Sequence, residues 1–118
     1  DNYPFKKETS DLDISLTSWL DDEAYLDQLE NSLAHILSHF TPDFIFFQAG
    51  VDELESDKHG KLSLSKDGLR RRALTVLKLC KKLDTPLCVS IGGGYSSRLV
   101  DTVEGHSQTF RLALDMFR

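Results

Sequence analysis

Cysteine, proline, methionine and tryptophan are scarce in this 118-residue sequence, which contains two, three, one and one of them respectively. Both cysteines, Cys80 and Cys88, fall within apolar stretches and lack the spacing of a disulfide framework or a metal site. We therefore expect buried free thiols, a reducing compartment and a cytoplasmic location. No apolar run is long enough for a membrane span or for the apolar region of a signal peptide, so we expect no membrane partner.

Positive charge is also in deficit, because 14 lysines and arginines stand against 19 aspartates and glutamates, for a formal net charge of −5. Nucleic-acid-binding modules gain affinity by neutralising phosphates with lysine and arginine, so this balance argues against direct nucleic-acid binding. The length is that of one domain with a modest core.

Glycine is concentrated at one place in the chain. Gly92, Gly93 and Gly94 are consecutive, and Tyr95 follows them directly. Such a run lets the backbone turn freely and lets another group approach the main chain closely, at an entropic cost that an ordinary loop has no reason to bear. The run therefore marks Tyr95 as a carefully placed side chain.

Apolar residues at helical spacing predict three helices. The first begins at Asp21, with acidic residues in its first turn, and ends before Pro42. The second follows Ser65, a good N-cap residue, and ends before Pro86. The third runs from Leu99 to the chain end. The apolar stripe of each helix is expected to face the core. The stripe comprises Leu26, Leu29, Leu33, Ile36 and Phe40 in the first helix, Leu69, Ala73, Val76, Cys80 and Leu83 in the second, and Leu99, Val103, His106, Phe110, Leu114 and Phe117 in the third.

Two continuous apolar runs, residues 44–47 and 87–91, predict strands. Runs of this kind are typical of strands that are covered on both faces, as in a parallel sheet. Residues 11–16 instead alternate between polar and apolar types, which predicts a short, half-exposed edge strand.

Strand, helix and strand in this order predict a βαβ unit with parallel strands, whose carboxyl ends meet at one edge of the sheet. Asp52 and Tyr95 then lie together at this edge, where open α/β sheets bind ligands. A carboxylate there can act as a general base, ligate a metal or merely cap a loop. A phenol can donate a hydrogen bond to a developing oxyanion or merely pack beside the next helix. Together they suit metal-assisted attack on a carbonyl.

Several motifs occur in a fixed order along the chain. They are Asn2-Tyr3-Pro4-Phe5, Ser10-Asp11-Leu12-Asp13-Ile14, Asp22-Glu23 with Tyr25-Leu26, residues 40–52 ending in Ala49-Gly50-Val51-Asp52, Leu62-Ser63-Leu64 with Gly68-Leu69, and Gly92-Gly93-Gly94-Tyr95. In this order they resemble the C-terminal part of the histone deacetylase family, which includes acetoin-utilisation proteins and acetylpolyamine amidohydrolases. The early motifs resemble bacterial and class IV-like members.

The resemblance implies an α/β fold of the three-layer arginase/deacetylase type with a parallel sheet, of which residues 1–118 form a single partial domain. It also implies zinc-dependent hydrolysis of the acetyl amide of acetyl-lysine or of an acetylated small amine. By the same resemblance, Asp52 is a zinc ligand and Tyr95 donates to the oxyanion of the tetrahedral intermediate. Gly93 and Gly94 are implied to line the acyl-lysine tunnel.

The family's other zinc ligands, in an Asp-x-His motif, and its general base, in a His-His pair, belong to a region before this chain, and neither motif is present. None of His35, His39, His59 and His106 stands at a matching position. We expect the first two to lie on a solvated helix face and His106 to be packed. A single carboxylate cannot hold catalytic zinc, so we expect the isolated chain to be inactive and to pair with the missing N-terminal portion or with itself.

Two features leave alternatives open. Trp19 and Asp21 stand where family members usually have glycines, so Trp19 either packs against the sheet or marks a partner surface. The chain also fits a non-catalytic remnant, or an α/β module that binds an anion at the helix opening after the glycine run. The patterns of nucleotide-binding loops are absent from the sequence.

Overall fold

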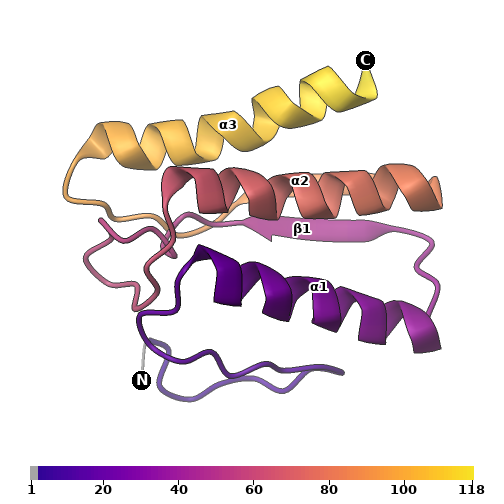
Figure 1. Ribbon diagram of the computed structural model, residues 1–118, viewed down its shortest axis with the longest axis horizontal. Coiled ribbons are helices and arrows are strands. Elements are labelled where there is room, and N and C mark those ends of the chain that lie inside the picture. Colours follow the sequence, from indigo (N-terminus) through magenta and orange to yellow (C-terminus); the bar gives the residue numbers. More distant parts are fainter. Residues whose placement is uncertain (1–2) are drawn as a thin grey trace.

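The computed structural model describes residues 3–118, so Asn2 of the first motif lies outside the described residues. Three helices and two strands follow one another in the order α1 (Asp22–His39), β1 (Ile45–Ala49), α2 (Lys66–Leu83), β2 (Leu87–Ile91) and α3 (Leu99–Phe117). The two strands pair in parallel, and α2 connects them along the chain. Helix α2 lies between α1 and α3 (Figure 1). The predicted α/β order and the parallel βαβ unit are therefore confirmed.

Helices α1 and α2 each begin at an N-cap residue whose side chain accepts a hydrogen bond from a backbone amide. The Asp21 carboxylate accepts a hydrogen bond from the Ala24 amide, and the Ser65 hydroxyl accepts one from the Gly68 amide, each at 3.0 Å. These bonds satisfy amides that have no partner within the helix. The N-cap that the sequence predicts at Ser65 is confirmed.

The sheet is covered on one face only, contrary to the prediction that both faces are buried. Side chains of β1 alternate between half-buried and exposed, and Phe46 on the open face is 80% exposed. Cys88 pairs with Phe46 across the strands and shares this face, so its thiol is exposed, whereas Cys80 on α2 is buried as predicted. Within residues 3–118 the fold has a helical layer and a sheet layer, and a third layer is missing.

Helix α3 packs through a different face from the one predicted. Its buried residues are Asp101, Gly105 and Thr109, whereas the large side chains of the predicted apolar stripe are exposed. The absence of a side chain at Gly105 explains this choice, because a Cβ there would lie 3.0 Å from Val51, so the helix backbone approaches the core closely. Exposed members of the stripe are Leu99, Val103, Phe110, Leu114 and Phe117.

The edge strand predicted over residues 11–16 does not form. A local turn takes its place, in which the hydroxyl and the amide of Ser10 both donate to the Asp13 carboxylate, at 2.6 and 3.0 Å. Short polar side chains of this kind offer the backbone an alternative to pairing in a ladder.

The main hydrophobic cluster lies under the loop that follows β1. It consists of Val51, Leu54, Leu64 and Leu69, none more than 2% exposed, with Tyr25 and Leu62 packed against it. Backbone bonds from Leu64 to Glu53 and from Glu55 to Leu64 hold this loop against the segment before α2. A fully buried apolar cluster thus supports the carboxyl edge of the sheet. Across residues 3–118, no helix has the length and apolar character needed to cross a membrane.

Candidate active site

The loops that follow β1 and β2 meet at the carboxyl edge of the sheet, as the sequence predicts. The amide of Val51 donates to the carbonyl of Gly93 at 2.7 Å, which joins the two loops two residues past the strand ends at Ala49 and Ile91. This hydrogen bond places the residue before Asp52 beside the glycine run. Segments some forty positions apart in the sequence therefore form one surface.

Asp52 presents its carboxylate over the glycines of both loops. A Cβ placed on Gly93 would lie 2.7 Å from Asp52 Oδ2, and a Cβ on Gly50 would lie 2.8 Å from Oδ1. Real Cβ atoms do not come so close to an oxygen, so both positions require glycine for the carboxylate to stay where it is. The side chain of Asp52 is exposed and is open to a ligand at this edge.

Tyr95 is held through its backbone, which leaves its phenol free to act. Its amide donates to Asp57 Oδ2 at 2.5 Å, and its carbonyl accepts from the Lys58 amide at 3.2 Å. The ring meets the His59 imidazole edge to face, with 5.4 Å between the ring centres, and the residue is 60% exposed. The phenol is therefore available to a bound molecule.

Sequence reasoning assigned no role to Asp57 or His59, yet both contact Tyr95. Asp57 Oδ1 accepts from the amides of His59 and Gly60, each at 2.8 Å, which folds the loop so that Oδ2 faces Tyr95. An aspartate that bonds to amides two and three residues later is a recognisable turn signal. That signal predicts the local turn but not the distant residue that it reaches.

Gly94 and His106 lie on the inner side of the glycine run. A Cβ on Gly94 would lie 2.4 Å from a methyl of Val51 and 3.3 Å from His106 Nε2. Glycine at this position therefore allows the turn to sit close to α3. His106 is half-buried, which agrees with the predicted packing role, whereas His35 and His39 are exposed on α1 as predicted.

A buried charged pair lies directly behind the Asp52 loop. Arg72 on α2 is 3% exposed, and its Nη1 donates to Glu53 Oε1 at 2.7 Å. Burial raises the pKa of the Glu53 carboxyl, an effect that the nearby Arg72 guanidinium opposes. Burial, together with the Glu53 charge, also raises the pKa of the Tyr25 phenol. The residue that follows Asp52 is thus anchored in the interior.

The backbone amides after the glycine run are already engaged within the protein. The Tyr95 amide bonds to Asp57, the Ser96 amide to the Thr102 hydroxyl at 3.3 Å, and the Ser97 amide to the Ser56 carbonyl at 3.1 Å. An anion site at a helix opening needs amides that point at the ligand without another partner. The amides of these three residues are therefore not available to an anion.

A metal at this edge would need ligands beyond those of the described residues. Across residues 3–118, no group of three or more histidine, cysteine, aspartate or glutamate side chains lies close enough together to hold an ion. Asp52 fits the part of one ligand, because its carboxylate is exposed and is fixed over Gly50 and Gly93.

Comparison with known proteins gives a consistent result. Residues 3–109 match the sequence model of the family described as the histone deacetylase domain. An uncharacterized protein of Picosynechococcus is 41% identical over 116 residues, which cover 98% of this chain and 39% of that protein. Histone deacetylase 2 of Arabidopsis thaliana is 29% identical over 113 residues, which cover 90% of this chain and 29% of that protein. The chain thus spans about two fifths or less of the length of these relatives.

Solved structures agree on the fold. The HDA15 HD domain superposes with a TM-score of 0.68 at 24% identity, over 83% of this chain and 27% of that one. An acetylpolyamine aminohydrolase from Burkholderia pseudomallei superposes with a TM-score of 0.70 at 18% identity, over 86% of this chain and 28% of that one. Both support the expected arginase/deacetylase type of α/β fold, of which the two layers seen here are a part.

Proposed function

This chain belongs to the histone deacetylase family, and on that premise we propose that it forms the C-terminal portion of a zinc-dependent deacetylase. The proposed reaction is hydrolysis of the acetyl amide of acetyl-lysine or of an acetylated small amine. The observation that carries the proposal is the Val51 to Gly93 hydrogen bond, because it sets Asp52 and the glycine run before Tyr95 side by side.

Asp52 is the proposed metal ligand in this chain. When bound, zinc polarises the acetyl carbonyl and brings the pKa of its water towards neutrality. Catalytic zinc takes three protein ligands, so the other two, and the general base, come from outside these 118 residues. The isolated chain is accordingly expected to be inactive.

Tyr95 is the proposed oxyanion donor. Its phenol is exposed, and its backbone is fixed by Asp57 and Lys58, so the hydroxyl can be held ready before the reaction. A preorganised donor of this kind stabilises the charge that develops on the carbonyl oxygen. Gly93 and Gly94 are proposed to line the channel for the acylated side chain, where the main chain of Gly93 lies against Asp52.

The uncovered surfaces support a partner that completes the domain. Phe46 on the open sheet face is 80% exposed, and Leu99 and Leu114 on the outer face of α3 are 76% and 59% exposed. The two strands also have no further strand beside them within residues 3–118, and a two-stranded sheet is marginal by itself. We propose that the N-terminal portion of the same domain covers these surfaces, and that self-association does so in its absence.

The test uses a protein that joins this chain to the segments supplying the remaining ligands. We expect zinc-dependent release of acetate from an acetyl-lysine peptide or an acetylated polyamine. Tyr95→Phe should lower kcat by ~10²–10³ with zinc retained, and Asp52→Ala should lose zinc. Asp43→Ala is the matched control, because Asp43 is an exposed aspartate at the opposite end of β1. Full activity in Asp52→Ala would refute the proposal.

A further inference from the structure

Arg72 ties down the chain on both sides of Asp52. Its Nη2 donates to the carbonyl of Gly50 at 2.8 Å, and its Nη1 donates to Glu53 Oε1 at 2.7 Å. Gly50 lies two residues before Asp52, and Glu53 directly follows it. The hydrogen bonds of the guanidinium go to these two residues, between which Asp52 lies.

The guanidinium itself has little freedom to move. Arg72 is 3% exposed, and its guanidinium carbon lies 5.5 Å from the centre of the Phe47 ring on β1. Arginine offers donors in a planar fork of fixed geometry, so one residue on α2 can meet a carbonyl and a carboxylate in set directions. Lysine has a single ammonium and cannot reproduce that arrangement.

Stability is a poor explanation for this buried pair. Arg72 Nε and Glu53 Oε2 are buried without a hydrogen-bond partner, so the desolvation of both groups is only partly offset. Buried ion pairs are often no more stabilising than apolar residues of the same size. A pair with unsatisfied atoms, placed behind one loop, indicates a role in the geometry of that loop.

We propose that Arg72 is a positioning residue that, given the zinc-binding role proposed for Asp52, holds the Asp52 loop in its metal-binding shape. Groups behind the direct ligands of a metal commonly orient them, and losing one typically costs ~10–100-fold in metal affinity. Arg72 differs from such groups in acting through the backbone at Gly50 and through the neighbouring Glu53.

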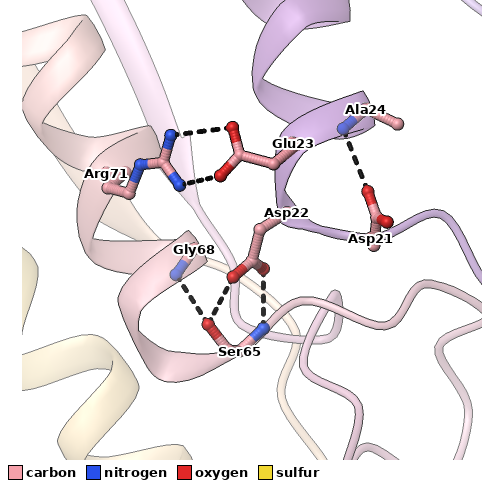
Figure 2. Close-up of polar contacts among 7 residues, drawn as sticks. All are labelled: Asp21, Asp22, Glu23, Ala24, Ser65, Gly68 and Arg71. Carbon is pink, nitrogen blue, oxygen red and sulfur yellow. Dashed lines mark hydrogen bonds and ion pairs between the residues drawn. The ribbon is translucent and has the colours of Figure 1, made fainter.

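Arg71 provides a matched control on the same helix. It pairs with Glu23 of α1 (Figure 2) and its side chain is 39% exposed, whereas that of Arg72 is 3% exposed. Arg71→Met and Arg72→Met therefore each remove one positive charge and one arginine–glutamate ion pair from adjacent positions. Only the second change releases Gly50 and Glu53.

The experiment measures two quantities in the protein that joins this chain to the remaining ligands. Zinc affinity is measured by competition with a chromogenic chelator, and we expect Arg72→Met to weaken it ~10–100-fold while Arg71→Met leaves it unchanged. In the metal-free protein, the Val51 amide is protected from hydrogen exchange by its bond to Gly93. Exchange of this amide should be faster in Arg72→Met than in Arg71→Met, because only Arg72 holds the neighbouring Gly50 carbonyl.

The outcomes separate this inference from the proposed function. If Asp52→Ala binds zinc as tightly as the parent, the proposed function fails. Hydrogen exchange of the Val51 amide in Arg72→Met then still tests whether Arg72 stabilises the loop. If Asp52→Ala loses zinc while Arg72→Met keeps parental affinity and exchange, the positioning role is overturned.

A second variant covers the case in which Arg72→Met does not fold. Glu53→Gln keeps the side-chain volume and one acceptor for Arg72 but removes the charge. We expect several-fold weaker zinc binding at an unchanged circular dichroism spectrum. Parental affinity and parental Val51 exchange in Glu53→Gln would overturn the inference.

Discussion

The Asp22 carboxylate, in the first turn of α1, accepts hydrogen bonds from both the amide and the hydroxyl of Ser65, the N-cap residue of α2 (Figure 2). The Ser65 hydroxyl in turn accepts from the Gly68 amide, so one carboxylate joins the starts of two helices. Asp22 therefore belongs to the packing of α1 on α2 as well as to the acidic first turn that the sequence predicts.

Asp22→Ala should destabilise the chain by about 1–3 kcal/mol, because it removes a charged acceptor from two donors that are partly buried. Chemical denaturation measures the change. Asp27→Ala is the control, since Asp27 is exposed on the same helix. Equal effects of the two substitutions would argue against a special role for Asp22.

Gly68→Ala should also destabilise, although alanine normally favours a helix over glycine by about 1 kcal/mol. The reason is local, because a Cβ on Gly68 would lie 2.0 Å from Asp22 Oδ1. In an Asp22→Ala background the clash is gone, and the same substitution should become neutral or stabilising. A double-mutant cycle in denaturant measures this change of sign, and additive effects would contradict it.

Asp101→Asn should lower the melting temperature at pH 7 and have no effect in strong acid. A hydrogen bond from the Lys66 ammonium, 2.6 Å away, holds the pKa of the Asp101 carboxyl below its ordinary value of 3.8. An acid whose pKa is lower in the folded state than in the unfolded state stabilises the fold at pH values above the unfolded-state pKa. This contribution is lost as the pH falls through the folded-state pKa. Thermal melts from pH 7 downwards check this, with Asp115→Asn, from an exposed pair, as the control.

Trp19→Gly should be more stable than Trp19→Ala by about 1 kcal/mol, since residues with a Cβ are strained in the left-handed region. Trp19 has φ 66°, and its amide bonds to the Lys61 carbonyl, which holds this conformation in place. The indole is 70% exposed, so both variants lose the same small contact area. Denaturant titration compares them, and a more stable alanine variant would contradict the prediction.

Phe46→Thr should weaken self-association of the isolated chain without lowering its stability by more than about 0.5 kcal/mol. Phe46 is exposed on the open sheet face, and threonine suits a strand as well as phenylalanine does. Sedimentation velocity measures the association. Phe5→Thr is the control, because Phe5 is 84% exposed and lies outside the sheet. An equal effect of Phe5→Thr would show that the chains do not associate specifically through the open sheet face.

Much of the candidate site could be predicted from the sequence. Strand order alone places Asp52 and Tyr95 at one edge, because a βαβ unit permits a single arrangement of its parallel strands. The contacts of Asp57, His59 and Arg72 could not be predicted, because each depends on how a loop or a helix face is turned towards a distant segment. Local sequence signals contain no such information.

The sequence by itself determined the three helices and the two paired strands, since periodicity, caps and prolines act over a few residues, although the strand predicted over residues 11–16 does not form. Strand β2 has the predicted bounds, and Ser65 is the predicted cap. Only the tertiary structure decided which faces are buried. Helix α3 packs through Gly105 and Thr109 and leaves Phe110 exposed, because close backbone approach to Val51 outweighs burial of the larger side chains within these 118 residues.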